Sequence, residues 1–297
     1  MGLTPDIFVH SLDEYLFEGM PFATGPLYQL CGRILLETPH RHTFYEILYI
    51  TEGDGTHFID FEPYPLKPPA FYFISPGQVH LWQVRSTLQG RVLMFEEDFL
   101  VFPSSNISKT NEITFFHNVG EAPELHLTQD QAAKIDSLLK SIFQEYKSEG
   151  FSRASMLRAY IHILIIQLQR LHMIDHPKQN AINESELVRR FKRLVAAHYN
   201  TEHSIQTYAD DLGVSISHLN NILKSMTGYS PGQLIRHEIA MEAKRLLVHT
   251  ELSISEVGYR LRFEDPSYFG RFFKRETGMN PALFREQIRE KYQLFPR

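Results

Sequence analysis

Residues 265–281 read DPSYFGRFFKRETGMNP, and residues 215–231 read SISHLNNILKSMTGYSP. The two stretches share Thr, Gly and Pro at an offset of 50 residues. Other positions correspond at the same offset: Leu219 with Phe269, Leu223 with Phe273, and Lys224 with Lys274. This internal similarity predicts two related supersecondary units in tandem.

Each unit has the pattern of a helix-turn-helix. In the first, Ala209 is small where two helices must cross closely, and Gly213 follows where the turn favours positive φ. In the second, Gly258 replaces the alanine, while Asp265 and Pro266 form a start signal for the next helix, an N-cap followed by proline. We expect an amphipathic helix over residues 230–248 to join the two units.

Residues 186–288 resemble the paired helix-turn-helix domain of AraC/XylS-type transcription regulators. The residues that carry the resemblance are EAKRLL (242–247), SISEV (253–257), DPSYFGRFFKRETG (265–278) and the closing Pro281 to Arg285. One departure is Arg262, which stands where the family has glycine at the second turn. If the positive φ is kept, an arginine there costs about 1–2 kcal/mol. A phosphate contact is the alternative role for Arg262.

The resemblance implies which side chains face DNA. An α-helix fits the major groove, and asparagine and arginine pair well with adenine and guanine edges. Expected base-reading residues are Ser217, Asn220, Asn221, Ser267 and Arg271. Lys224 and Lys274 are expected to contact phosphate and so to position the protein. The two recognition helices would enter successive major grooves about 34 Å apart.

The N-terminal half shows a different pattern. Residues 28–100 contain β-branched and aromatic runs, namely GRILLE, YEILYI, THFIDF, AFYFIS and GRVLMF, separated by turn-like TEGDG, EPYPLKPP and SPGQ. Short strands at this spacing predict a β-sandwich or small barrel. In PHRHTFYEILYITEG (39–53) the side chains of His40, His42 and Glu46 alternate along an apparent strand and so share one face. His80 and Trp82 share a face of a later strand.

The spacing from His40 to Gly53, followed by Pro76 to His80, is similar to the two motifs of cupin barrels, here in the sensory domain common among AraC/XylS regulators. By resemblance this domain binds a small organic effector, and we expect His40, His42, Glu46, His80 and Trp82 to contact it. Two alternatives remain open. His40, His42, Glu46 and His80 also have the ligand types of a Zn, Fe, Ni or Mn site, or they form a structural hydrogen-bonded cluster.

Two helices are predicted after the barrel. Thr128 and Gln131 form a capping-box signal, and the second helix, roughly 152–173, carries an apolar seam at spacings of four and three: Leu157, Ile161, Leu164, Leu168 and Leu171. Such a seam is typical of a coiled coil between two subunits; packing on the chain's own barrel is the alternative. The polar stretch 175–185 is expected to be a linker.

Composition sets outer bounds. The chain has 297 residues and one cysteine, so we expect two domains, no disulfide framework and a cytoplasmic location. No secretion signal or membrane span is expected. From Glu186 onward there are 17 Lys and Arg against 13 Asp and Glu, whereas the earlier residues carry 13 against 22. A basic C-terminal half favours a nucleic-acid partner.

The sequence thus predicts an α+β two-domain protein: a cupin-like ligand-sensing barrel (1–127), a helical dimerisation and signal-transmitting segment (128–174), a linker (175–185) and an all-α paired helix-turn-helix domain (186–297). We expect a transcription regulator, by resemblance more often an activator, that binds promoter DNA, a small effector and RNA polymerase as a homodimer. No cofactor and no catalysis are expected. The competing hypotheses are a metal-dependent cupin enzyme or metal sensor fused to a DNA-binding domain, and a constitutive DNA-binding protein.

Overall fold

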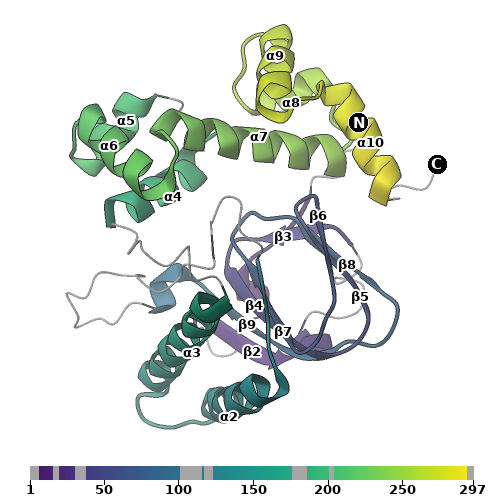
Figure 1. Cartoon of the computed structure of the whole chain (residues 1–297), viewed down its shortest axis with the longest axis vertical. Coiled ribbons are helices and arrows are strands. Elements are labelled where there is room, and N and C mark those ends of the chain that lie inside the picture. The colour runs from purple at the N-terminus through teal and green to yellow at the C-terminus, as the bar shows by residue number, and fades with distance from the viewer. Residues whose placement is uncertain are drawn as a thin grey trace. The chain divides into compact units, whose positions relative to one another are not determined.

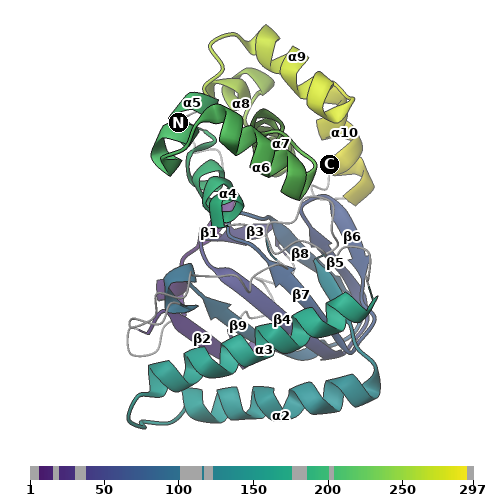
Figure 2. The same cartoon turned by 60° about the vertical axis from the view of Figure 1, so that its left-hand side comes forward.

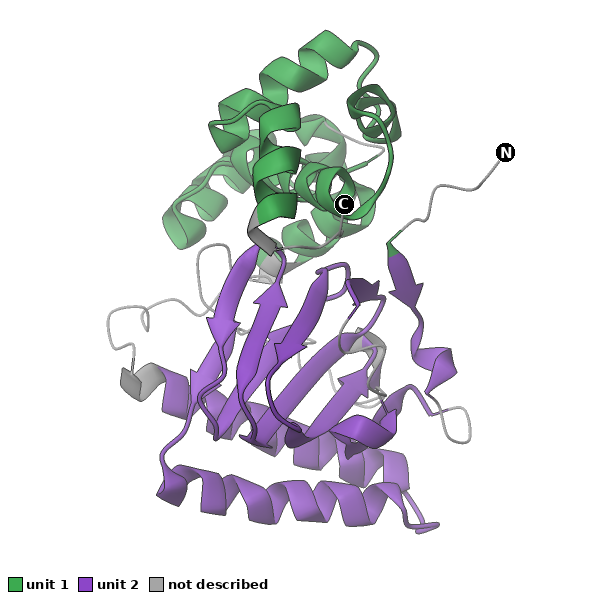
Figure 3. Cartoon of the chain, turned by 90° about the vertical axis from the view of Figure 1, so that its right-hand side faces the viewer, with its two compact units in different colours: residues 1–7, 182–297 green, residues 8–181 purple. Residues whose placement is uncertain are grey.

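The computed structural model describes residues 7–15, 20–30, 38–100, 116, 123–175, 186–200 and 204–292. The chain forms two compact units (Figure 3). Residues 8–181, labelled unit 2 and drawn in purple, are called the first unit below, and residues 182–297 together with 1–7, labelled unit 1 and drawn in green, are called the second unit. The predicted strand GRILLE (32–37) and all of the predicted linker except Asp175 lie outside the described residues. In the described part of the chain, no helix is long and apolar enough to cross a membrane.

The first unit is built on two five-stranded sheets (Figure 1). The first sheet has the order β1-β3-β8-β5-β6, formed by Phe8–His10, His40–His42, His80–Val84, Gly55–Ile59 and Glu62–Pro65. The second has the order β10-β7-β4-β9-β2, formed by Glu124–His126, Ala70–Ile74, Tyr45–Glu52, Gln89–Phe95 and Phe22–Pro26. The sheet-rich domain confirms the predicted cupin-like fold class.

Strand β4 separates two apolar layers because its side chains alternate between the faces of its sheet. Tyr45, Ile47 and Tyr49 belong to a cluster that also contains residues of two helices, α2 and α3. Leu48 and Ile50 belong to a second cluster, which contains residues of both sheets. The interior between the sheets therefore receives the even-numbered residues of β4.

The stretch 39–53 was expected to be one strand, and this expectation is wrong. Strand β3 ends at His42, and β4 begins at Tyr45 in the other sheet. The chain crosses between the sheets at Thr43 and Phe44. A two-residue connection keeps the alternation in phase, so the sequence pattern continues through the bend without a visible break.

Helices α2 (Gln129–Tyr146) and α3 (Arg153–Asp175) pack beside the second sheet (Figure 2). The predicted capping box is present, since Thr128 and Gln131 exchange hydrogen bonds between side chain and backbone. The seam of α3 was expected to pair two subunits, and this is wrong for four of its five residues, which instead fit the alternative of packing on the chain's own barrel. Leu157, Ile161, Leu164 and Leu168 are 0% exposed within the subunit, because they pack with α2 and the sheet.

The second unit is all α. Its helices are α4 (Glu186–His198), α5 (Ile205–Leu212), α6 (Ile216–Thr227), α7 (Pro231–His249), α8 (Ile254–Arg260), α9 (Pro266–Thr277) and α10 (Pro281–Tyr292). The pairs α5–α6 and α8–α9 are the two predicted helix-turn-helix units, and α7 runs between them (Figure 1).

Helix α7 is buried around much of its circumference, whereas an amphipathic helix was expected. Even Glu242 and Arg245 are buried, and they form an ion pair at 3.4 Å. The reason is that helices of both helix-turn-helix pairs, and also α4 and α10, pack against α7. This central helix ties the two helix-turn-helix units into one body.

Candidate functional sites

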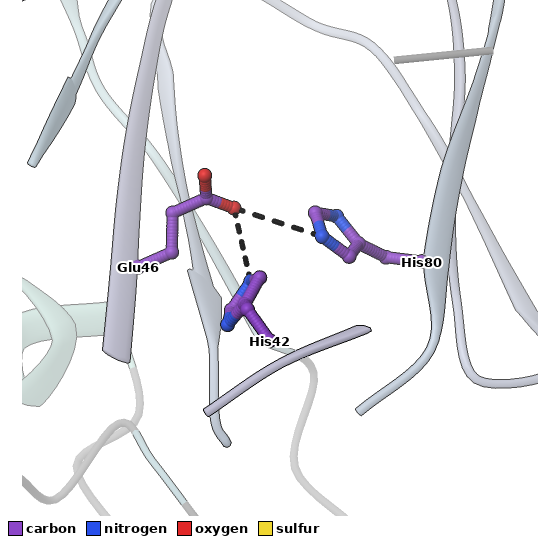
Figure 4. Close-up of side chains that lie close together, drawn as sticks. All are labelled: His42, Glu46 and His80. Carbon is purple, nitrogen blue, oxygen red and sulfur yellow. Dashed lines mark ion pairs between the residues drawn. The ribbon is translucent and has the colours of Figure 1, made fainter. Parts of the chain in front are cut away.

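Three polar side chains converge in the interior of the first unit. His42 comes from β3, Glu46 from β4 and His80 from β8, and all three are buried (Figure 4). Glu46 Oε2 lies 3.5 Å from His42 Nε2 and 3.8 Å from His80 Nε2. The chain's crossing between the sheets causes this meeting, because it places His42 and Glu46 on opposite sheets.

The Nδ1 atoms of His42 and of the neighbouring His40 already make hydrogen bonds. His42 Nδ1–H donates to the carbonyl oxygen of Phe44 at 2.7 Å, and His40 Nδ1–H donates to the carbonyl oxygen of Thr38 at 2.8 Å. A carbonyl only accepts, so both rings must carry their proton on Nδ1. In the neutral form His42 Nε2 therefore presents a lone pair to Glu46.

Burial disfavours the charged form of three imidazoles in and around the cluster, those of His40, His57 and His80. It lowers the pKa of His40 below its ordinary value, and it lowers the pKa values of His57 and His80 well below theirs. Neighbouring imidazoles add to the effect on His57 and His80, because a second positive charge nearby would repel the first. A neutral imidazole has one nitrogen with a free lone pair, which can accept a hydrogen bond or bind a cation.

The cluster contains buried polar atoms that lack hydrogen-bond partners. Among the described residues these include His42 Nε2, Glu46 Oε2 and His80 Nε2, and also His57 Nδ1 and Trp82 Nε1. An unpaired buried polar group costs about 1–3 kcal/mol, so such a concentration is expensive. A bound ion or polar molecule would satisfy these atoms, which makes the cluster a candidate binding site.

Two further histidines surround the cluster, and the sequence analysis did not identify them. His57 on β5 lies 3.1 Å from His80 (Nε2 to Nδ1) and stacks on Trp82 with ring centroids 3.6 Å apart. His10 on β1 contacts the ring of His40. The signal for His57 was a polar residue at an interior-facing position of the run THFI, directly opposite Trp82.

The structure therefore brings together four of the five residues expected to contact a ligand. His40 lies beside His80, with ring centroids 4.3 Å apart, but it is outside the group of three whose ligand atoms all lie within 4.8 Å of one another. Trp82 is further removed, because it contacts His57 and Tyr72.

The expected base-reading residues of the first helix-turn-helix lie on α6. Ser217 and Asn221 are exposed and Asn220 is partly exposed, while Leu219 and Leu223 are buried beneath them. Lys224 is exposed in the last turn. The helix thus presents a polar face and hides the apolar one.

The equivalent face of α9 is more basic. Ser267, Arg271 and Lys274 are exposed, and the side chain of Arg271 is 73% exposed. The guanidinium of Arg271 lies 4.0 Å from Asp265 and 5.9 Å from the ring centre of Tyr268. Tyr268 and Arg275 are also exposed on α9 and were not predicted as contacts. Asp265 accepts a hydrogen bond from the Ser267 amide, which confirms its role as the N-cap.

Two family models match the chain. Residues 208–287 match a helix-turn-helix domain, and residues 37–165 match an AraC-like ligand binding domain. The chain combines the two domains of an AraC-type transcription regulator. The first match covers both recognition helices of the regulator, and the second covers His40, His42, Glu46 and His80.

Curated relatives agree with this assignment. The regulator is 25% identical to the HTH-type transcriptional activator RhaR of Enterobacter sp. (strain 638), over 84% of this chain and 88% of that one. It is also 25% identical to the activator RhaS of the same organism, over 94% and 96%. Among solved structures, the C-terminal domain of AraT from Geobacillus stearothermophilus is 28% identical, covering 35% of this chain and 87% of that one, with a TM-score of 0.34.

Proposed function

We propose that this AraC-type regulator is a cytoplasmic homodimer that activates transcription when a small organic effector occupies the His/Glu cluster of the first unit. Its second unit would bind promoter DNA through α6 and α9. The observation that carries the ligand part is the group of buried, unpartnered polar atoms on His42, Glu46 and His80. The names of the relatives, which are transcriptional activators, support the direction of regulation.

The DNA-binding part rests on the two exposed polar faces. Helices α6 and α9 are the second helices of their units, the position from which a helix-turn-helix protein reads the major groove. Both pack against α7, so one rigid body would present both helices to DNA. Contact with RNA polymerase is part of the proposal, because activation requires recruitment or stimulation of the polymerase at the promoter.

Control by an effector requires that the ligand bind the DNA-competent and DNA-incompetent states with different affinity. The candidate link is the α2–α3 pair, because its helices share a hydrophobic cluster with Tyr45 and Ile47 of β4. Glu46 lies between these two residues in the strand. A ligand on Glu46 would act on one face of β4 while the helices pack on the other. A small shift of the strand would then reach α3.

Dimerisation is assigned to the outer face of α3. Met156 and Ile163 are 42% and 44% exposed and lie seven residues apart. Ala159 lies between them and Ile166 follows, so the four residues are spaced by three, four and three. This is heptad spacing on the face opposite the buried seam. A second copy of the same helix fits such a stripe by symmetry.

The proposal is tested by selecting binding sites from random double-stranded DNA with the full-length protein, followed by titration of candidate effectors. We expect a sequence motif with two half-sites per subunit, and an effector that changes affinity for it. Binding of all sequences with equal affinity would contradict the DNA-reading role. If the protein selects a motif but no candidate effector changes its affinity for that motif, the constitutive alternative is favoured.

A further inference from the structure

We propose that His42 Nε2, Glu46 Oε2 and His80 Nε2 bind one divalent first-row transition-metal ion inside the first unit. One potential ligand atom from each residue lies within 4.8 Å of the other two, and all three residues are buried. The site goes beyond the effector-controlled function above, and its existence does not depend on DNA binding.

The distances fit a metal centre better than a hydrogen-bonded cluster. The carboxylate oxygen Oε2 of Glu46 is 3.5 Å from His42 Nε2 and 3.8 Å from His80 Nε2, too long for hydrogen bonds, which the three atoms indeed do not make. Around a tetrahedral zinc ion with bonds of about 2.0–2.1 Å, neighbouring ligand atoms are about 3.3 Å apart. The two Glu46 distances need to shorten by only a few tenths of an ångström, whereas the separation of the two imidazole nitrogens, which lies within 4.8 Å, would shorten by up to about 1.5 Å as both rings turn toward the ion.

The proton positions also favour a cation. His42 Nδ1–H donates to the carbonyl of Phe44 at 2.7 Å, so Nε2 is the ring nitrogen left to bind an ion beside Glu46. The three potential ligand atoms face one another in a buried place and have no hydrogen-bond partners, which is costly unless another group satisfies them. A divalent ion satisfies all three atoms together.

A second layer of contacts holds the ligands in orientation. His80 Nδ1 lies 3.1 Å from His57 Nε2, and His57 is fixed by stacking on Trp82 at 3.6 Å. Donation from His80 Nδ1–H to His57 leaves His80 Nε2 free for the metal, and His57 is then a positioning residue. Metal-bound histidines in proteins are typically held in this way, through the other ring nitrogen.

The ligand set indicates the class of ion. Two imidazoles and one carboxylate suit Zn²⁺, Fe²⁺, Mn²⁺ or Ni²⁺, and they bind Ca²⁺ or Mg²⁺ poorly because those ions prefer oxygen ligands. Three protein ligands leave at least one coordination position for water or for an oxygen of a small ligand. The ion would therefore be part of what the first unit senses, or the group through which it holds an effector.

The experiment uses the full-length protein after removal of metal with a chelator and dialysis, with no DNA present. Zn²⁺ is titrated by calorimetry, and Co²⁺ is followed by its visible absorption and by fluorescence. Trp82 is the only tryptophan in the sequence, so Co²⁺ at the site should quench the whole tryptophan signal. We expect one ion per chain, with binding lost in Glu46→Gln and His42→Gln, and weakened about 10–100-fold in His57→Phe.

The matched control is His126→Gln. His126 forms a similar pair with Glu124 at 3.4 Å, but its side chain is 40% exposed, so it represents an ordinary surface pair. Binding should be unchanged in this variant. Zinc affinity that survives Glu46→Gln, or falls equally in His126→Gln, would overturn the proposal.

Folding of each variant is checked by circular dichroism. If the variants at residues 42 and 46 do not fold, the unmodified protein still decides the question. Less than about 0.2 Zn²⁺ per chain at concentrations near 100 μM, or no quenching of Trp82 by Co²⁺, would overturn the site, since a specific site of this type fills at far lower concentrations. Failure of DNA selection would leave this result untouched, so the two proposals fail separately.

Discussion

Gly213 and Arg262 occupy the same position in the two helix-turn-helix units, and both have left-handed backbone, with φ of 69° and 63°. In each unit the next amide bonds back to the carbonyl five residues earlier. Val214 N–H donates to Ala209, and Phe263 N–H donates to Gly258, both at 3.0 Å. The second helix-turn-helix thus keeps the turn that glycine favours, although an arginine stands in it.

Arg262→Gly should stabilise the second unit by about 1 kcal/mol. Glycine adopts positive φ without the steric penalty of a side chain, which is about 1–2 kcal/mol, and returns part of that gain through its larger unfolded-state entropy. The measurement is the free energy of unfolding in urea. An unchanged or lower value would mean that Arg262 makes compensating contacts in the folded state.

The neighbouring arginine provides the control. Arg260 ends α8 in ordinary helical conformation, so Arg260→Gly should lower stability by up to about 1 kcal/mol. If Arg262 also contacts phosphate, Arg262→Gly will reduce affinity equally for all DNA sequences while it raises stability. The two roles of Arg262 are therefore separable in one variant.

Gly258 and Phe269 should be energetically coupled. A Cβ at residue 258 would lie 3.2 Å from Cβ and Cγ of Phe269, which is crowded. The first helix-turn-helix has the reverse sizes at the same crossing, Ala209 and Leu219. We expect the double variant Gly258→Ala, Phe269→Leu to lose less free energy of unfolding than the two single variants together, by about 0.5–2 kcal/mol.

Gly270 is the matched glycine for this cycle. It lies within α9, and a Cβ there would meet nothing within 4 Å. Gly270→Ala should therefore stabilise the protein by up to about 1 kcal/mol through helix propensity alone. Additive effects at residues 258 and 269, within about 0.3–0.5 kcal/mol, would contradict the size exchange.

Much of the fold could be read from local signals. The capping box at Thr128 and the start signal at Asp265 and Pro266 act over a few residues, so the sequence places them accurately. The seam of α3 was harder. Its spacing shows that one face is buried, but the same spacing results whether the covering surface is a partner helix or the chain's own sheet.

The binding site was only partly predictable, for a related reason. Alternation places His42 and Glu46 on interior faces, which holds even though a bend separates their strands. The neighbours of His80 depend on which strands pair and in what register, as in the pairing of His57 with Trp82. Register is set by the tertiary fold, so the sequence marks His57 as a polar residue at an interior-facing position but does not place it beside His80.

Arg271 and Lys274 should differ in how they affect DNA binding. Arg271→Ala is expected to cost about 1–3 kcal/mol at the preferred site and to relax one base preference, because arginine pairs with guanine edges. Lys274→Ala should weaken binding of all sequences and reduce the salt slope by about 1. Affinities for the selected site and for base-substituted sites at several salt concentrations give both quantities. An equal loss on all sequences for Arg271→Ala would make it a phosphate contact.

Arg285 should be a structural residue of the second unit. It donates to the carbonyl oxygens of Leu247, near the end of α7, and of Leu252, at 2.7 and 2.5 Å. Charge-assisted bonds to such carbonyls are worth about 1.5–3 kcal/mol, so Arg285→Ala should lower the free energy of unfolding by about 2–3 kcal/mol. Lysine should rescue only part of this, since one ammonium does not reproduce the planar fork of arginine.

The control for Arg285 is Arg275, which is 58% exposed and pairs with the adjacent Glu276. Arg275→Ala should change stability by less than about 0.5 kcal/mol, as expected for an exposed pair. Urea denaturation of the three variants makes the comparison. Equal losses for Arg285→Ala and Arg275→Ala would show that the carbonyl contacts contribute nothing specific.

The two faces of α3 should respond differently to a charge. Ile163 is 44% exposed on the outer stripe, whereas the adjacent Leu164 is fully buried in the subunit. Ile163→Lys should leave the fold intact and convert dimers to monomers, because like charges would oppose each other across the symmetric interface. Leu164→Lys should instead unfold the first unit, since it places an unpaired charge in a packed core. Light scattering measures the mass and circular dichroism the fold; a folded Ile163→Lys protein that keeps the dimer mass would move the subunit interface away from α3.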